Sequence, residues 1–283
     1  MNFNDKQTLD FIHRAFEEDI KEGDHSSLAS IPQGTQGKAK LIFKDKGIVA
    51  GIELAKVILR ELDPEIQFDV FKNDGDSVEY GDIGFIVSGS VHAILAGERL
   101  LLNCMQRLSG VATQTHNLVK LMGDSKSRLL DTRKTTPNLR FLEKWAVTIG
   151  GGYNHRIGLY DMIMLKDNHN DYAGGITNAV NKTKAYLKEK NLSLKVEVET
   201  RNLDEVKEAL AVGGVDRIML DNFTPERIVE ALQVINGQVE TEASGGINET
   251  SLAAYAATNV DFISIGALTH SVKSMDISLK ETD

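Results

Sequence analysis

Hydrophobic residues recur along this chain with the period of a helix in some segments and of a strand in others. The order of these segments differs between the first third of the chain and the rest. In the first third, apolar positions at helical spacing predict helices over Gln7–Lys21 and Ile52–Leu62. Short alternating runs bounded by turn residues predict strands at Ala39–Phe43, Gln67–Phe71, Gly84–Val87 and His92–Leu95. This pattern is typical of a small α+β domain in which helices cover one side of an antiparallel sheet.

A longer helix is predicted over Glu98–Leu121, with an apolar stripe along one side. Its other side carries polar residues and few acids, namely Arg99, Asn103, Gln106 and Arg107. The simpler interpretation is an ordinary solvated surface, and the alternative is a surface reserved for an anionic ligand or another subunit. Cys104 is the only cysteine and lies on the apolar stripe, so we expect a core thiol, no disulfide within the chain and no cysteine-based metal site.

From Arg128 onward, apolar strands alternate with amphipathic helices. The predicted strands are Arg128–Asp131, Met162–Lys166, Leu194–Glu199, Arg217–Asp221, Val239–Ala243 and Phe262–Ile265. The predicted helices are Leu139–Ile149, Ile176–Lys190, Leu203–Val212, Pro225–Ile235 and Glu249–Ala257. Such alternation implies right-handed βαβ units and a parallel sheet. About six units with near-continuous apolar strands predict an α/β fold, either a barrel or a doubly wound sheet.

Polar residues or glycines follow every one of these strands. The strand ends read Asp131-Thr132-Arg133-Lys134, Lys166-Asp167-Asn168-His169, Glu197-Val198-Glu199, Asp221-Asn222, Ser244-Gly245-Gly246, and Ser264 with Gly266-Ala267. In α/β barrels the active site lies at the carboxyl ends of the strands. If the strands close into a barrel, these residues therefore meet at one mouth.

Two of the motifs carry adjacent cations. Arg133 and Lys134 stand next to threonine hydroxyls, an arrangement suited to binding phosphate or carboxylate, although a solvated basic turn is the alternative. The run Gly150-Gly151-Gly152 precedes His155 and Arg156. A helix C-cap explains one glycine of the run, whereas three in a row favour a flexible loop that presents an imidazole and a cation.

The remaining motifs suit a metal ion and phosphate. Glu199 and Asp221 could form ion pairs with lysines, or hold Mg²⁺ together with substrate oxygens, because Mg²⁺ takes few protein ligands. The turns at Ser244-Gly245-Gly246 and Ser264-Ile265-Gly266-Ala267 offer backbone N–H groups to a phosphate. Phosphate sites after the final two strands are a recurring feature of barrels.

The composition excludes several classes of partner. With 41% hydrophobic and 26% charged residues, the 283-residue chain has an ordinary globular composition. A formal net charge of -9 argues against nucleic acid as a general partner. The segment Met1–Ile20 lacks the pattern of a signal peptide, and no apolar run approaches the roughly 18–20 residues of a membrane span. We therefore expect a cytoplasmic protein that does not bind a membrane.

Taken in order, the motifs resemble the quinolinate phosphoribosyltransferase family, whose members are also called carboxylating nicotinate-nucleotide pyrophosphorylases. The resemblance spans the whole chain and rests on Asp131–Pro137, Gly150–Leu159, Lys166–His169, Val196–Glu199, Met219–Phe223, Glu242–Ile247 and Ser264–Leu268. Two departures are visible: Asn138 stands where the family usually has glycine, and Gly213-Gly214 lengthens a loop by one residue. Asparagine tolerates a left-handed backbone and a surface loop absorbs an insertion, so neither departure changes the expectation.

The resemblance implies an incomplete α/β barrel preceded by an N-terminal α+β sandwich domain. The expected boundaries are residues 1–110 for the first domain and 111–270 for the catalytic barrel, with the tail 271–283 returning to the first domain. The resemblance also implies a homodimer in which the N-terminal domain of one subunit covers the barrel mouth of the other. Arg99 would then be supplied across the interface, and assembly of dimers into hexamers stays open.

The implied reaction is a pentosyl transfer in de novo NAD biosynthesis. Quinolinate and phosphoribosyl pyrophosphate give nicotinate mononucleotide, pyrophosphate and carbon dioxide, with Mg²⁺ and without a redox or pyridoxal cofactor. By resemblance, the substrate-binding residues are Arg99, Thr132, Arg133, Lys134, His155, Arg156, Lys166, Glu199, Asp221, Ser244, Gly245, Gly246, Ser264, Gly266 and Ala267. Arg133, His155 and Arg156 bind the quinolinate carboxylates, whereas the two glycine-containing turns cradle the 5′-phosphate.

The same resemblance implies four catalytic residues. Lys134 and Lys166 lie beside quinolinate and the sugar phosphates. Glu199 and Asp221 hold the ribose hydroxyls and Mg²⁺, partly through substrate or water.

Three alternatives remain open from the sequence. A paralogue associated with molybdate transport shares the fold but departs from this pattern around Thr135-Thr136-Pro137 and Lys166–His169. A nicotinate or nicotinamide phosphoribosyltransferase binds a ring with at most one carboxylate, whereas Arg99, Arg133 and Arg156 suit a dicarboxylate. A non-catalytic anion-binding protein would not need a pair of carboxylates to hold a metal ion.

Overall fold

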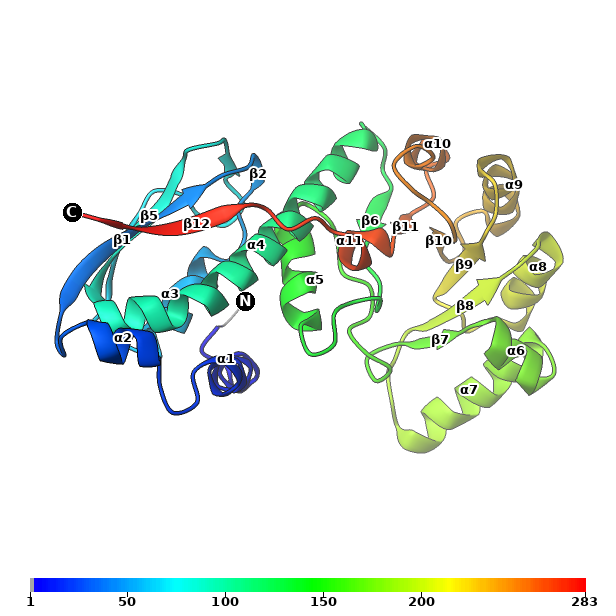
Figure 1. The fold of residues 1–283 in the computed structure, drawn as a ribbon. Helices are drawn as coiled ribbons and strands as arrows, with labels where there is room; N and C mark the ends of the chain where they lie inside the picture. The colour runs from blue at the N-terminus through cyan, green and yellow to red at the C-terminus, as the bar shows by residue number, and fades with distance from the viewer. Residues whose placement is uncertain (1–2) are drawn as a thin grey trace. The chain divides into compact units, whose positions relative to one another are not determined.

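The computed structural model describes residues 3–283, which fold as two compact units. Unit 1 comprises residues 3–116, Thr136–Gly151 and Ser271–Asp283. Unit 2 comprises Asn117–Thr135 and Gly152–His270. The elements of both units are labelled in Figure 1. None of the helices described is long and apolar enough to cross a membrane.

Unit 1 is built on an antiparallel sheet in the order β12-β1-β5-β3. Its strands are β1 (Gln36–Phe43), β3 (Gln67–Val70), β5 (Ile83–Ser90) and β12 (Ile277–Thr282). A small second sheet pairs β2 (Gly47–Ile48) with β4 (Ser77–Val78). The helices are α1 (Lys6–Asp19), α2 (His25–Ser30), α3 (Ile52–Arg60), α5 (Arg140–Ile149) and most of α4 (Val91–Leu121). The C-terminal strand β12 therefore pairs with β1, from the opposite end of the chain, as Figure 1 shows.

The strand predicted at His92–Leu95 is wrong, because these residues form the first turn of α4. A short apolar run fits either a strand or a buried helix, and tertiary packing decides between them. Ala93 and Ile94 are buried in α4. Gly97 of α4 comes so close to α3 that a Cβ atom there would lie 2.5 Å from Leu59. Further along the same helix Cys104 is buried, as predicted for a core thiol.

Unit 2 is built on a six-stranded parallel sheet in the order β6-β11-β10-β9-β8-β7. The strands are β6 (Arg128–Leu130), β7 (Ile163–Leu165), β8 (Val196–Thr200), β9 (Arg217–Asp221), β10 (Glu240–Ser244) and β11 (Phe262–Ser264). The first strand pairs with the last, so the sheet curls into a barrel that stays open between β6 and β7. This order confirms the incomplete barrel and excludes the doubly wound sheet.

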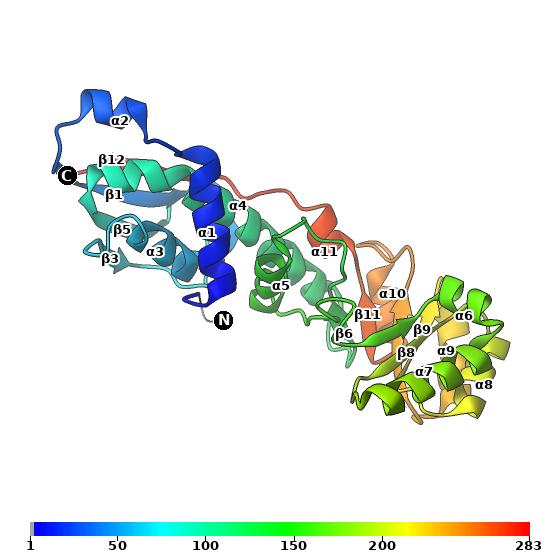
Figure 2. The ribbon, with the colours of Figure 1, turned by 90° about the horizontal axis from the view of Figure 1, so that it is seen from below.

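Helices of unit 2 follow every strand of this sheet except β6, as the labels in Figures 1 and 2 show. They are α6 (Asp167–Ala173), α7 (Ile176–Lys190), α8 (Leu203–Val212), α9 (Pro225–Ile235), α10 (Leu252–Ala257) and α11 (Ala267–His270). The short helices α6 and α11 were not predicted, and neither was α2. Each is too short for an apolar period to be read from the sequence.

The loop after α5 lies beside the opening between β6 and β7. The backbone N–H of Tyr153 donates to the carbonyl of Leu129 at 2.8 Å, and the N–H of Asp131 donates to the carbonyl of Tyr153 at 3.1 Å. Leu130 and Tyr153 thus form a parallel bridge. Because this loop stands next to β6 where a further strand would lie, it brings His155 into the interior of unit 2.

Candidate active site

A cavity of about 620 Å³ lies in unit 2 at the carboxyl ends of the parallel strands. Fourteen of the fifteen predicted site residues line it: Thr132, Arg133, Lys134, His155, Arg156, Lys166, Glu199, Asp221, Ser244, Gly245, Gly246, Ser264, Gly266 and Ala267. The strand ends therefore meet at one mouth, as expected for a barrel. Arg99 is not among the lining residues. It lies on α4 in unit 1, where it lines a smaller hollow of about 300 Å³ with Phe11, Asn103 and Leu139.

Two arginines give one side of the cavity a positive charge. Arg156 is partly buried, and its Nη1 donates to the carbonyl of Met162 at 3.2 Å. Burial, and then the nearby charge of Arg133, lower the pKa of Arg156 from its usual value. Two guanidinium groups that repel each other in a partly desolvated cavity are stabilised by an anion between or beside them.

Two carboxylates line the same cavity from adjacent strands, Glu199 on β8 and Asp221 on β9. The pKa of Glu199 is raised, mainly by burial and also by Asp221, while the charge of Lys166 acts in the opposite direction. The pKa of Asp221 is also raised, mainly by burial. A bound cation would relieve this excess of buried negative charge. The pair therefore fits the oxygen ligands that Mg²⁺ prefers.

The predicted ion pair between a lysine and this pair of carboxylates is present as well. Nζ of Lys166 lies 3.7 Å from Oε2 of Glu199. The backbone N–H of Asp167 contacts Oε1 of Glu199 at 3.4 Å. Beside them, the side-chain amide of Asn222 donates to Asp221 at 2.6 Å. These neighbours orient the two carboxylates and leave both of them on the cavity wall.

The turn after β10 is shaped by two glycines with left-handed backbones, Gly245 at φ +95° and Gly246 at φ +63°. A Cβ atom at Gly245 would lie 2.3 Å from Oδ1 of Asn222 and 2.8 Å from its backbone nitrogen. The backbone N–H of Asn222 donates to the carbonyl of Ser244 at 2.8 Å. The turns after β9 and β10 are therefore packed together without room for a side chain at Gly245.

The turn after β11 lies against the first cationic motif. Thr269 donates its hydroxyl to the carbonyl of Lys134 at 2.8 Å. A Cβ atom at Gly266 would lie 2.9 Å from the Lys134 side chain and 3.0 Å from that of His270. His270 also lines the cavity and was not predicted from the sequence. Its position four residues after Gly266, in the turn that follows the last strand, was the available signal.

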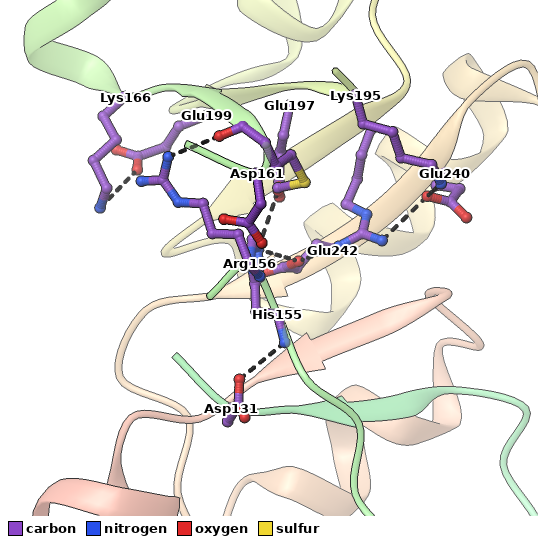
Figure 3. A network of polar contacts seen from close by, with 12 residues as sticks. Asp131, His155, Arg156, Asp161, Lys166, Lys195, Glu197, Glu199, Glu240 and Glu242 are labelled. Carbon is purple, nitrogen blue, oxygen red and sulfur yellow. Dashed lines mark hydrogen bonds and ion pairs between the residues drawn. The ribbon is translucent and has the colours of Figure 1, made fainter. Parts of the chain in front are cut away.

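His155 belongs to a buried ionic cluster, shown in Figure 3, of which His155 and Glu242 line the cavity. Its Nε2 lies 3.1 Å from Oε2 of Glu197 and 3.3 Å from Oε2 of Glu242. Its backbone N–H donates to Oδ1 of Asp131 at 2.9 Å. Neither Glu197 nor Glu242 was predicted from the sequence as a site residue. Period-two alternation places Glu197 on the same face as Glu199, and Glu242 on the same face as Ser244, so this signal was available.

The members of this cluster shift one another's protonation. Burial disfavours the charged form of His155, but hydrogen bonds and charges from Glu197 and Glu242 outweigh it and raise its pKa to about 9. Burial, with the charge of Glu242, raises the pKa of Glu197 to about 7. Burial also acts to raise the pKa of Glu242, yet His155, Ser264 and Arg217 leave it lowered.

The ligand atoms of His155, Glu197 and Glu242 lie within 4.8 Å of one another, which is close enough to hold a metal ion. However, Nη1 of Arg217 already lies 3.1 Å from Oε2 of Glu242. The Nε2 atom of His155 faces both carboxylates as a hydrogen-bond donor, and the Arg217 guanidinium supplies positive charge where a metal ion would otherwise bring it. We therefore interpret the cluster as an ion-pair network.

Comparison with known proteins identifies a family. Residues 111–280 match the C-terminal domain of quinolinate phosphoribosyl transferase, and residues 24–109 match its N-terminal domain. The chain is 48% identical over 274 residues to a protein of Arabidopsis thaliana named nicotinate-nucleotide pyrophosphorylase [carboxylating], chloroplastic, covering 91% of this chain and 78% of that protein. It is 43% identical over 280 residues to a Bacillus subtilis protein named probable nicotinate-nucleotide pyrophosphorylase [carboxylating], covering 99% of this chain and 95% of that one. The crystal structure of NadC from Streptococcus pyogenes superposes with a TM-score of 0.94 at 39% identity, covering 100% of both chains.

Proposed function

The chain belongs to the quinolinate phosphoribosyl transferase family, and on this premise we propose how its residues carry the reaction. The enzyme is a pentosyltransferase that converts quinolinate and phosphoribosyl pyrophosphate to nicotinate mononucleotide, pyrophosphate and carbon dioxide, a step of NAD biosynthesis. The observation that supports this function best is the single cavity in which arginines and lysines face a pair of carboxylates and two tight turns.

The cations of the cavity match the charge of the substrates. Quinolinate carries two carboxylates, and phosphoribosyl pyrophosphate carries a 5′-phosphate and a pyrophosphate. In our proposal, Arg133 and Arg156 bind the quinolinate carboxylates, with Thr132 and the His155 ring in the cavity wall beside them. Fixed cations of this kind hold two anionic reactants together and stabilise charge in the transition state.

The transfer itself is assigned to Lys134, Lys166, Glu199 and Asp221. Positive charge develops on the ribose carbon as pyrophosphate leaves, and the two carboxylates stabilise that charge and hold the ribose hydroxyls. Glu199 and Asp221 would also hold Mg²⁺, partly through substrate or water, and the metal ion when bound would neutralise the pyrophosphate. The raised pKa values of both carboxylates support this assignment.

The remaining steps follow from the chemistry of the ring. Ribosylation makes the ring nitrogen cationic, and this charge stabilises the carbanion left when the adjacent carboxylate departs as carbon dioxide. Decarboxylation therefore follows glycosyl transfer. The turns at Ser244-Gly245-Gly246 and at Ser264, Gly266 and Ala267 bind the 5′-phosphate through their backbone N–H groups.

We also propose an oligomeric state and a cellular location for the enzyme. We assign the enzyme to a cytoplasmic homodimer in which Arg99 of one subunit reaches quinolinate in the other. The support is that Arg99 is exposed on a face of α4 with few acids. Sedimentation of the purified enzyme tests the dimer, and fractionation of cells tests the location.

An assay with quinolinate, phosphoribosyl pyrophosphate and Mg²⁺ tests the function. Release of carbon dioxide from carboxyl-labelled quinolinate, together with formation of nicotinate mononucleotide, is the expected result. The control replaces quinolinate by nicotinate, which has one carboxylate. Turnover of nicotinate without turnover of quinolinate would overturn the assignment.

A further inference from the structure

Glu197 and Glu242 are buried carboxylates to which the reaction described above gives no role. Both are 0% exposed. Each lies two residues before a cavity residue of the same strand, Glu197 before Glu199 on β8 and Glu242 before Ser244 on β10. Burying a carboxylate is costly unless a cation or hydrogen-bond donors compensate for it. Two such groups close together, of which Glu242 lines a cavity for anionic substrates, therefore require an explanation.

The strand register brings the two carboxylates toward the same interior point. Glu197 on β8 is opposite Arg217 of β9, and Glu242 on β10 is opposite Met219 of β9. The two glutamates thus flank β9 from both sides. Their side chains converge on Nε2 of His155, at 3.1 Å from Glu197 and 3.3 Å from Glu242, as Figure 3 shows.

The contact of Nδ1 of His155 indicates which ring nitrogen carries the hydrogen. Nδ1 accepts the backbone N–H of Arg156 at 2.6 Å. In the neutral ring the nitrogen that accepts has no hydrogen, so the ring hydrogen is on Nε2, between the two carboxylates. The doubly protonated ring also carries this hydrogen on Nε2, but only the neutral ring can accept the N–H of Arg156 at Nδ1. In both states the glutamate pair fixes the orientation of the ring, with Nε2–H toward Glu197 and Glu242.

Arg217 is a further member of the cluster. Arg217 contacts Glu242 and also Glu240, each at 3.1 Å, and its guanidinium stacks over Phe262 at 3.9 Å from the ring centroid. Arg217 is thereby fixed to two strands, β9 and β10. Glu242 is held between the imidazole of His155 and the guanidinium of Arg217, so the cluster supports the His155 ring from the interior of the sheet.

We propose that Glu197 and Glu242 are positioning residues for quinolinate binding, which act through the imidazole of His155 to hold the His155–Arg156 segment in the cavity wall. The segment comes from a loop and not from a strand, so it lacks the support that a sheet gives to the other cavity residues. The glutamate pair supplies that support from inside the barrel. Glu199 and Ser244 share strands β8 and β10 with the two glutamates, but the parallel sheet itself fixes their positions, so we expect the effect to fall mainly on quinolinate.

The inference rests on the proposed function, and kinetics of isosteric variants test it. Glu197→Gln and Glu242→Gln remove the charge and keep the shape. We expect each to raise the KM for quinolinate about tenfold, with the KM for phosphoribosyl pyrophosphate and kcat within about twofold of the wild type. Glu240→Gln is the matched control, because Glu240 contacts Arg217 on the same strand as Glu242 but not His155. It should leave all three constants unchanged.

A double-mutant cycle separates positioning from a general structural role. In a His155→Ala background, Glu197→Gln should raise the KM for quinolinate no further, because its effect passes through the imidazole. An equal rise in both backgrounds would overturn the inference. So would an unchanged KM in folded Glu197→Gln and Glu242→Gln enzymes.

Nitrogen-15 NMR of the wild-type enzyme reports which ring nitrogen of His155 carries the hydrogen. It tests the same inference without an activity assay and without substitution of either glutamate. The His155 signals are assigned by their loss in His155→Ala. A hydrogen on Nε2 is expected, and a ring protonated on Nδ1 alone would refute the inference. Wild-type turnover of quinolinate is measured separately, so that failure of the proposed function is distinguished from failure of this inference.

Discussion

Nζ of Lys166 lies 3.7 Å from Oε2 of Glu199, at the carboxyl ends of the adjacent strands β7 and β8. The Lys166 side chain is half exposed, at 50%, whereas that of Glu199 is only 9% exposed. The lysine therefore lies on the solvent side of the carboxylate. The charge of Lys166 favours the ionised form of Glu199, which still lines the cavity.

Activity should depend on Mg²⁺ more strongly at low pH. The pKa values of Glu199 and Asp221 are raised, so protons compete with the metal ion for these oxygens at a higher pH than for ordinary carboxylates. We expect the Mg²⁺ concentration for half-maximal rate to rise as the pH falls. Initial rates across a Mg²⁺ series at several pH values measure this, and EDTA should abolish turnover. A requirement for Mg²⁺ that does not change in Asp221→Asn would contradict the assignment.

Lys134→Ala should lower kcat about 100-fold to 1,000-fold and leave the fold intact, because a fixed cation at the site of transfer is lost. Steady-state kinetics and a thermal melt check both parts. Lys182→Ala is the control, since Lys182 is an exposed lysine on α7 in the same unit. Rates within twofold of the wild type in Lys134→Ala would remove Lys134 from the reaction.

Gly245→Ala should weaken binding of phosphoribosyl pyrophosphate more than binding of quinolinate. The new methyl group would lie 2.3 Å from Oδ1 of Asn222, in a backbone with φ +95° that alanine rarely adopts. The KM for phosphoribosyl pyrophosphate is expected to rise at least about tenfold. Gly237→Ala is the control, because Gly237 also has a positive φ but has open space around it. An equal effect of both substitutions would mean that the turn after β10 has no special role.

Mixing two inactive variants should restore activity if Arg99 acts across a dimer interface. Arg99→Ala subunits keep an intact cavity, and Arg133→Ala subunits keep an intact Arg99. In a random mixture, about half of the dimers are heterodimers, each with one site that has both arginines. Turnover after denaturation and refolding of the mixture, compared with each variant alone, measures the rescue. Absence of rescue in mixtures that contain heterodimers would place Arg99 in its own subunit's site or outside the reaction.

The local pattern of this sequence was sufficient for most elements of unit 2 and for the composition of its cavity. Alternation of apolar strands and helices depends on neighbouring residues, so the strands from β6 to β11 were predicted to within a few residues. The polar strand ends follow from the same register, because parallel strands place their carboxyl ends at one edge. Asn138, expected to accept a left-handed backbone, has φ +63°.

Where a local pattern fits two structures, tertiary contacts determine which of the two forms. The apolar run His92–Leu95 suits a strand as well as a helix, and packing of α4 against α3 makes it a helix. Likewise, six βα units suit an open sheet or a barrel. Closure depends on the pairing of β6 with β11, which sets Arg128 beside Phe262. No local period reports a contact between residues so far apart in the chain.

His155 shows, at a single residue, the difference between what the sequence predicts and what the tertiary structure determines. The sequence by itself determined that an imidazole and a cation follow a glycine-rich loop, which predicts a site that presents both to a ligand. Only the tertiary structure decided that this loop enters the opening between β6 and β7 and turns Nε2 toward Glu197 and Glu242. The physical reason is that the burial of two carboxylates is compensated by groups from separate segments of the chain. These groups meet because the sheet curls into an incomplete barrel, which no single motif determines.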